Sequence, residues 1–233
     1  MSDPRIALVA EGPTDFIVIE AALIEAALKA ILQRSFVLNP LQPEPTRPDM
    51  GGWGGVFKWC QEFRQRGMAN MEADPTLSHF DLIIVHLDAD VADKKYADCG
   101  DAVVQAALGL QPLPCAQPCP PPFNTVAALE TVMLSWLGIA ANGPKSLFCI
   151  PSKATEAWLS VATLPVNHTL LTNLECSLDI EAKLAGLPKA QKIRKTVREY
   201  RNRAETVTSQ WAQVKAHCTQ AALFDQQVQA IFG

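Results

Sequence analysis

The chain has 233 residues, of which 48% are hydrophobic and 19% are charged. This composition excludes a disordered chain and provides enough apolar side chains for a sizeable core. The formal net charge of -4 excludes a general attraction to nucleic acid, so any such attraction must come from a local basic segment.

Several features predict a cytoplasmic protein with no membrane partner. The most apolar helical segment, roughly residues 14 to 33, contains Asp15, Glu20, Glu25 and Lys29, and these charges argue against a membrane span. The start of the chain lacks the basic segment and long apolar stretch of a signal peptide. The seven cysteines are odd in number and irregularly spaced, which is atypical of a disulfide framework and indicates a reducing compartment.

The first strong signal lies near the amino terminus. An apolar run from Arg5 ends at Glu11, and a Gly-Pro turn leads into an alanine-rich helix beginning near Thr14. We expect Glu11 at the carboxyl end of a strand and Asp15 in the first helical turn, where open α/β sheets bind their ligands. Two carboxylates at that position favour a metal such as Mg²⁺, because phosphates are bound there by backbone N–H groups and lysine.

A glycine-rich segment follows a short strand predicted near residues 35–40 and a proline-rich loop at residues 42–50. Residues 51–59 contain four glycines around Trp53 and lead into a helix. Such a segment can bind an anion, but this one lacks the Gly-Lys-Ser/Thr ending of a P-loop and the usual dinucleotide spacing. We therefore favour a structural interpretation, in which the glycines let Trp53 pack onto the sheet.

The second strong signal is the apolar run at residues 82–89, in which six of eight residues are apolar without alternation. This pattern predicts a buried strand in the middle of a parallel sheet. Asp88 and Asp90 end the run at the edge where Glu11 is expected. Residues two apart in an extended chain point the same way, so both could bind one ion, with Asp93 as a possible third acid.

The middle of the chain is expected to supply a third strand end. Residues 93–123 are predicted to be irregular, and an amphipathic helix is predicted from Asn124. A buried strand at residues 146–150 then runs into a polar turn and a helix. This arrangement brings Lys153 and Glu156 to the carboxyl end of that strand.

Past residue 164 the composition becomes basic, and two helices are predicted at the carboxyl terminus. Residues 183–203 contain eight of the 20 basic residues, opposed only by Glu199. Two interpretations stay open: a solvated helix face, or a clamp for a phosphate backbone. The candidate nucleic-acid-binding residues are Lys192, Arg194, Lys195, Arg198 and Arg201.

Carboxylates are thus expected to meet at one edge of the sheet. The candidate metal ligands are Glu11, Asp15, Asp88, Asp90 and Glu156. These acids would repel one another unless cations intervene or some are protonated. One or two Mg²⁺ or Mn²⁺ ions would resolve the repulsion, and their natural partner is a phosphate. Any single acid could instead cap a helix or turn, so the hypothesis depends on three strand ends each contributing.

These motifs resemble the TOPRIM domain shared by topoisomerases, bacterial primases and nucleases of the overcoming-lysogenization-defect (OLD) class. The resemblance lies in strand–Glu11-Gly-x-x-Asp15–helix, followed by an apolar strand ending in Asp88-x-Asp90. It implies a Rossmann-like α/β domain whose central, mainly parallel sheet has four strands flanked by helices. It also implies Mg²⁺ or Mn²⁺ as cofactor, with Glu11 as metal ligand or general base.

The spacing of Glu11 and Asp15 is closer to the OLD-type nucleases, which also have a later lysine and glutamate, here Lys153 and Glu156. More narrowly, Gly-Gly-Trp near residue 52, Cys-Pro-Pro near residue 120, Pro-Ser-Lys-x-Thr-Glu-Ala-Trp from residue 151 and the basic carboxyl-terminal region resemble a family of small stand-alone TOPRIM-like proteins. Members of that family tend to be encoded beside an ATPase in bacterial defence neighbourhoods.

The resemblance implies a catalytic domain at residues 1–164 and a basic helical extension at residues 165–233. In topoisomerases and primases the aspartate pair lies in a longer acidic, glycine-containing motif, whereas Val-Ala-Asp-Lys-Lys follows it here. The chain also lacks a strand-passage domain and a zinc-binding primase module. We therefore expect a nuclease acting on DNA or RNA as an anti-phage effector, with catalytic residues Glu11, Lys153 and Glu156. The alternatives are a primase-like nucleotidyltransferase and a non-catalytic subunit of an ATPase complex.

Overall fold

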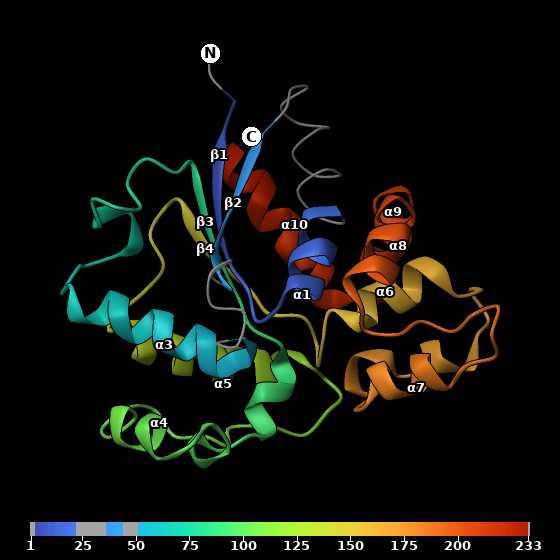
Figure 1. The fold of residues 1–233 in the computed structure, drawn as a ribbon, viewed down its shortest axis with the longest axis horizontal. Coiled ribbons are helices and arrows are strands. Elements are labelled where there is room, and N and C mark those ends of the chain that lie inside the picture. The colour runs from blue at the N-terminus through green and yellow to red at the C-terminus, as the bar shows by residue number, and fades with distance from the viewer. Residues whose placement is uncertain (1–2, 22–35, 44–50, 233) are drawn as a thin grey trace. The chain divides into compact units, whose positions relative to one another are not determined.

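The computed structural model describes residues 3–21, 36–43 and 51–232. It has an α/β fold with a four-stranded, all-parallel central sheet flanked by helices and with a helical carboxyl-terminal region (Figure 1). This result confirms the fold class predicted from the sequence. Among the described residues, none of the helices has the length and hydropathy that a membrane crossing needs.

The chain folds into two compact units. The first contains Met1–Gly12 and Ser35–Ile150, and the second contains Pro13–Arg34 and Pro151–Gly233. The domain boundary expected at residues 164 and 165 lies inside the second unit, and the division into a catalytic domain and an extension stays a prediction.

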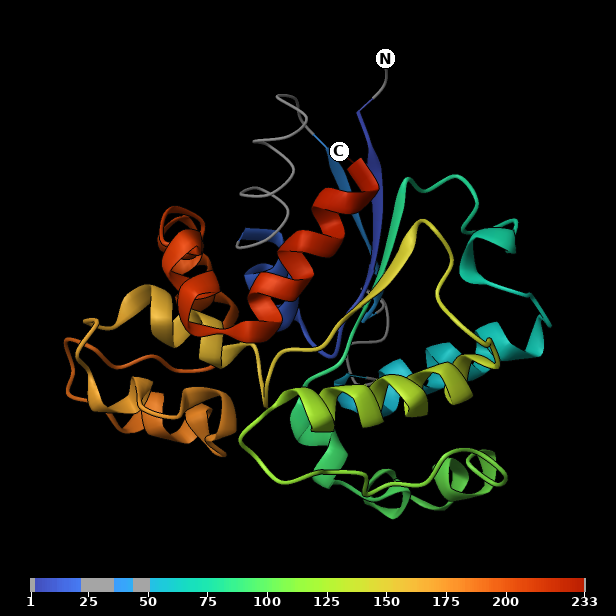
Figure 2. The same ribbon diagram turned by 180° about the vertical axis from the view of Figure 1, so that it is seen from behind.

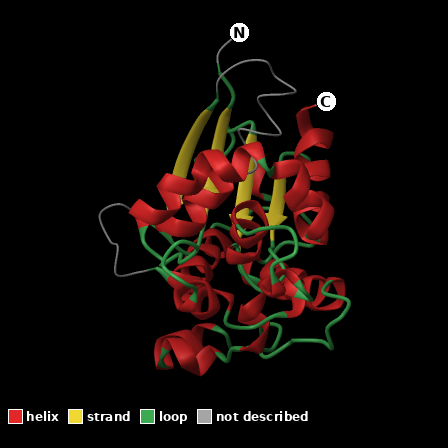
Figure 3. Cartoon of the chain, turned by 90° about the vertical axis from the view of Figure 1, so that its right-hand side faces the viewer, coloured by secondary structure: helices red, strands yellow, loops and turns green. Residues whose placement is uncertain are grey.

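The sheet belongs to the first unit. Its strands are β1 (Arg5–Val9), β2 (Val37–Gln42), β3 (Leu82–His86) and β4 (Ser146–Cys149). They run in the same direction (Figure 3). Their order in the sheet is β2-β1-β3-β4. All five residues of β3 are buried, as its unbroken apolar sequence predicts for an internal strand. Because β1 and β3 are parallel neighbours, the residues that follow them lie at the same edge.

Two helices cover one face of this sheet. Helices α3 (Gly52–Gln65) and α5 (Phe123–Leu137) lie side by side (Figures 1 and 2) and share a core with the alternate residues Ala7, Val9, Ile83 and Val85 of β1 and β3. Trp136 of α5 stacks on Trp53, with ring centroids 6.3 Å apart, and meets the edge of Phe57 at 5.2 Å. Trp53 is therefore a core residue, as the structural interpretation of the glycine segment predicted.

The connecting segments correct two sequence predictions. Helix α3 begins at Gly52, so three of the four glycines lie in its first turns instead of in a loop. Residues 93–123 are not irregular throughout, because they contain helix α4 (Asp101–Ala106). Gly100 has a φ of 90°, a conformation open to glycine, and this lets the chain turn directly into α4. Short 3₁₀ helices lie at η3 (Met71–Ala73), η4 (Ala89–Asp93) and η5 (Tyr96–Cys99).

The second unit is helical. Its helices are α1 (Pro13–Ile19), α6 (Glu156–Thr163), α7 (Ile180–Gly186), α8 (Val197–Ser209), α9 (Trp211–His217) and α10 (Thr219–Phe232), with 3₁₀ helices η6 (Thr169–Leu171) and η7 (Leu174–Cys176). Helix α8 packs against α1 and α6, and α9 packs against α6 and α10. The two terminal helices match the prediction, whereas residues 22–33 of the expected alanine-rich helix lie outside the described part of the chain.

Candidate functional site

Glu11 and Asp88 are brought together at the carboxyl edge of the sheet. Each follows its strand by one intervening residue, and the backbone N–H of Asp88 donates to Glu11 Oε1 at 2.7 Å. The carbonyl oxygen of Glu11 accepts from the N–H of Gly52 at 2.7 Å, which ties this turn to the start of α3. The parallel pairing of β1 and β3 thus positions these two predicted acids next to each other.

His86 is a member of this cluster that the sequence analysis missed. Its side chain is completely buried at the end of β3, and Nε2 lies 3.1 Å from Asp88 Oδ1. Metal-ligating and catalytic carboxylates are commonly oriented by such partners. The available signal was the spacing, since a polar residue two positions before Asp88 in a strand lies on the same side of the chain.

Asp90 does not have the expected extended geometry. Asp88 precedes the 3₁₀ helix η4, so the chain leaves the strand conformation directly after Asp88 and the period-two argument for Asp88 and Asp90 is wrong. Asp90 Oδ2 instead lies 3.6 Å from Lys94 Nζ, and its side chain is 40% exposed. Asp93, the possible third acid, ends η4 with an exposed side chain. The metal-ligand role of Asp90 stays a prediction.

In the second unit, Asp15 is held by the segment that follows β4. Thr155 Oγ1 donates to Asp15 Oδ1 at 2.6 Å, and both residues are buried. Asp15 lies in the first turn of α1, and Thr155 immediately precedes α6. The bond therefore links two helix starts that are 140 residues apart in sequence.

Glu156 directly follows Thr155 in the sequence and is also buried. Its Oε1 accepts from the Tyr200 hydroxyl at 2.6 Å and from Lys195 Nζ at 2.9 Å. Its Oε2 is buried and has no hydrogen-bond partner among the described residues. Burial, and then the charge of Glu156, raise the pKa of Tyr200, so the hydroxyl stays protonated and can donate. Tyr200 is 44 residues from Glu156, so no local pattern identified it.

Lys153 has a strained backbone. Its φ is 67°, and the N–H of Ala154 donates to the carbonyl oxygen of Ser152 at 3.0 Å. This combination is typical of the γ-turn with positive φ, which is rare. A non-glycine residue in such a conformation costs roughly 1–3 kcal/mol, and residues of this kind cluster at functional sites. The backbone geometry thus distinguishes Lys153 from an ordinary surface lysine.

The predicted nucleic-acid-binding residues fall into two groups. Arg194, Arg198 and Arg201 are exposed, and the last two lie three residues apart on one side of α8. Lys192 is half-buried, and its carbonyl oxygen accepts from Arg203 Nη2 at 3.2 Å. Lys195 contacts Glu156 and lies 3.6 Å from Glu181, so its ammonium group has carboxylate partners within the unit.

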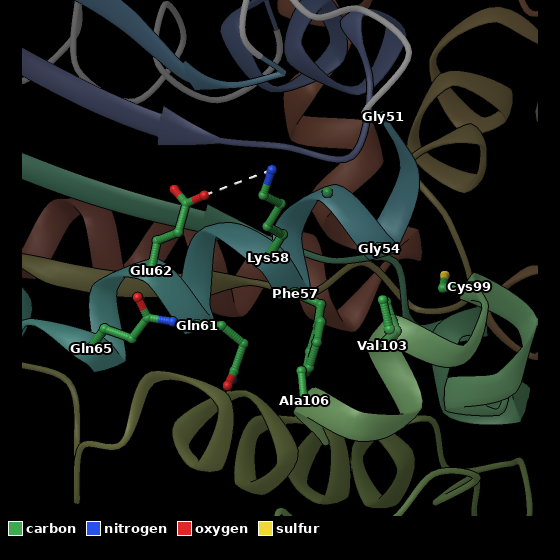
Figure 4. A pocket seen from close by; sticks show the side chains of 12 residues that line it. Gly51, Gly54, Phe57, Lys58, Gln61, Glu62, Gln65, Cys99, Val103 and Ala106 are labelled. Carbon is green, nitrogen blue, oxygen red and sulfur yellow. Dashed lines mark ion pairs between the residues drawn. The ribbon is translucent and has the colours of Figure 1, made fainter. Parts of the chain in front are cut away.

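The glycine segment borders a hollow of about 600 Å³ between α3 and α4 (Figure 4). Apolar side chains such as Phe57 and Val103 line it, and Lys58 lies 3.9 Å from Glu62 at its rim. Among the described lining residues Lys58 is the only cation, so the hollow has little charge with which to bind a phosphate. A Cβ on Gly54 would come within 2.9 Å of Cys99 Sγ, which gives this glycine a packing role.

The chemistry of Glu11, Asp88 and His86 fits a divalent cation. Carboxylate oxygens are the preferred ligands of Mg²⁺ and Mn²⁺, and imidazole suits several transition metals. A carboxylate offers about four lone-pair sites, and the N–H of Asp88 occupies one of those on Glu11. The hydrogen bonds within the cluster would orient the ligands in advance.

Comparisons of the chain with protein-family models, with curated proteins and with solved structures gave no match. The resemblance to TOPRIM domains therefore stays a prediction.

One prediction separates the internal role of Lys195 from a role in nucleic-acid binding. We expect Lys195→Met to lower the free energy of unfolding by about 1–2 kcal/mol, because buried Glu156 loses its cationic partner at a site that is partly open to solvent. Urea denaturation measures this change. Arg198→Met, an exposed basic residue of α8, is the control and should change stability by less than about 0.5 kcal/mol. Equal stability of Lys195→Met and the parent would show that the ion pair makes no net contribution to stability and would contradict the structural role assigned to Lys195.

Proposed function

We propose that the chain is a divalent-metal-dependent nuclease that hydrolyses phosphodiester bonds of DNA or RNA. The observation that carries the proposal is the approach of Glu11 to Asp88 at the ends of neighbouring parallel strands, with buried His86 against Asp88. Glu11 and Asp88 would hold Mg²⁺ or Mn²⁺. The bound ion would supply Lewis-acid polarisation of the phosphate and a lowered pKa for a bound water.

The side chains have separate tasks in this proposal. Glu11 holds the ion or accepts a proton from the attacking water, and His86 fixes the orientation of the Asp88 carboxylate. Lys153 donates to the scissile phosphate and stabilises the negative charge that develops there. The proposed roles of Asp15 and Glu156 in metal binding rest on their charge and burial within the second unit. From the family resemblance we also propose an anti-phage effector role beside an ATPase partner.

Cleavage assays test the proposal directly. Purified protein is incubated with supercoiled plasmid, single-stranded DNA and tRNA, each with Mg²⁺, with Mn²⁺ or with EDTA. We expect cleavage of at least one substrate with metal and none in EDTA. A parallel reaction with labelled nucleotides tests nucleotidyl transfer. A labelled product without cleavage would overturn the nuclease assignment in favour of that reaction, and the absence of both would favour a non-catalytic subunit.

A second measurement tests the exposed arginines. We expect Arg198→Ala and Arg201→Ala together to weaken nucleic-acid binding and to reduce the slope of log affinity against log salt concentration by about 2, because each phosphate contact contributes about 1. Fluorescence anisotropy with a labelled oligonucleotide in EDTA measures both quantities without cleavage. Lys145→Ala, an exposed basic residue before β4, serves as the control. An unchanged salt slope in the double variant would show that these arginines make no phosphate contacts. It would favour the interpretation of the basic segment as a solvated helix face.

A further inference from the structure

The turn that carries Lys153 is held by side chains on both of its sides. Before Lys153, the hydroxyl of Ser152 donates to Glu175 Oε1 at 2.8 Å. After it, Thr155 donates to Asp15, as described above. Ser152 is 2% exposed, so its hydroxyl depends on a protein acceptor in place of water. The strained residue therefore lies between two anchored neighbours.

Glu175 is fixed by a third segment. Thr219, the first residue of α10, donates from Oγ1 to both oxygens of the Glu175 carboxylate, at 3.1 and 3.0 Å. The N–H of Gln220 lies 3.4 Å from Oε1 and adds a weaker contact. One carboxylate thus connects the Lys153 turn, the η7 segment and the first turn of α10. Helix starts favour such a carboxylate because their first N–H groups have no partner within the helix.

We propose that Glu175 is a positioning residue that holds Lys153 in its left-handed conformation and so aims the ammonium group. The inference rests on the proposed function for what Lys153 does, whereas the anchoring of the turn stands on the hydrogen bonds alone. Because positive φ is unfavourable for lysine, the turn relaxes toward common backbone angles when its anchor is removed. The ammonium group then moves away from its productive position.

A double-mutant cycle tests whether Glu175 acts through Lys153. We expect Glu175→Ala to lower kcat about tenfold with little change in KM, since misplacement of a group that acts in the transition state reduces kcat. In a Lys153→Ala background the same substitution should change kcat less than about twofold, because residues that act as a unit are not additive. Glu175→Gln keeps an acceptor oxygen and should restore most of the activity. A full tenfold loss in the Lys153→Ala background would overturn the proposal.

Hydrogen exchange of the Ala154 amide tests the anchor without any catalysis. We expect exchange at this amide to be at least about tenfold faster in Glu175→Ala than in the parent, because its bond to Ser152 depends on the held turn. Ser152→Ala removes only one hydroxyl and should accelerate exchange in the same way. It provides the measurement if Glu175→Ala does not fold. Glu205→Gln, an exposed acid of α8, is the charge-matched control. Unchanged exchange in Ser152→Ala and Glu175→Ala overturns the anchor, whereas inactive parent protein with accelerated exchange overturns only the nuclease assignment.

Discussion

Replacing Asp88 with alanine is expected to reduce metal-dependent cleavage by more than about a hundredfold. Loss of a partner that only orients a metal ligand typically costs about 10- to 100-fold, and Asp88 is proposed to be a ligand itself. Its removal also takes away a carboxylate partner of buried His86 and one of the two carboxylates that would hold the ion. Initial rates of cleavage at saturating Mn²⁺ measure the effect.

Two further variants accompany Asp88→Ala, one at Asp88 itself and one at the other end of β3. Asp88→Asn keeps the size of the side chain and removes the negative charge, so it should lose nearly as much activity as Asp88→Ala. Asp81 precedes β3 at the opposite end, where its Oδ2 accepts from the N–H of Arg5 at 2.8 Å. Asp81→Asn should leave cleavage near the parent rate. Cleavage by Asp88→Ala at the parent rate would place any active site elsewhere.

Replacing Trp136 with alanine is expected to give the largest loss of stability in the first unit, about 3–5 kcal/mol. The indole is completely buried, contacts Trp53 and Phe57, and donates from Nε1 to the Tyr96 hydroxyl at 2.9 Å. The substitution removes these contacts and leaves a cavity between α3 and α5. Urea unfolding followed by far-ultraviolet circular dichroism measures the change.

Two further tryptophan variants show whether packing is responsible. Trp136→Phe keeps an aromatic ring but loses the hydrogen bond to Tyr96 and part of the ring volume, so it should cost less than Trp136→Ala, about 1–3 kcal/mol. Trp59 of α3 is half-buried, and Trp59→Ala should cost less than Trp136→Ala. A smaller loss in Trp136→Ala than in Trp59→Ala would contradict the core that the structure assigns to the first unit.

The internal strands and the acids at their carboxyl ends could be predicted from the sequence because their signals are local. The unbroken apolar runs before Glu11 and Asp88 predicted internal parallel strands, and parallel strands place their carboxyl ends at one edge. The hydrogen bond from the Asp88 N–H to Glu11 agrees with that expectation. The bend after Asp88 was not accessible, because a 3₁₀ turn directly after a strand has no strong sequence signature.

The hydrogen-bond partners of the predicted site residues and of their neighbours could not be predicted, because they depend on tertiary contacts between distant segments. Tyr200 lies 44 residues from Glu156, and Glu175 lies 23 residues from Ser152. Lys195 belonged to a basic segment whose two interpretations were equally open, and the structure gives its ammonium group a buried carboxylate partner. Composition and periodicity can predict a helix, but they do not predict which distant residues its side chains contact.

Anomalous scattering from a crystal soaked in Mn²⁺ tests the central claim most directly, because it locates the ion without assuming any activity. The structure and its proposed chemistry predict a peak within about 2–2.5 Å of oxygens from both Glu11 and Asp88, and no such peak in crystals of Asp88→Asn. Well-diffracting crystals of the parent protein with no manganese peak beside these two carboxylates would contradict the proposed metal site.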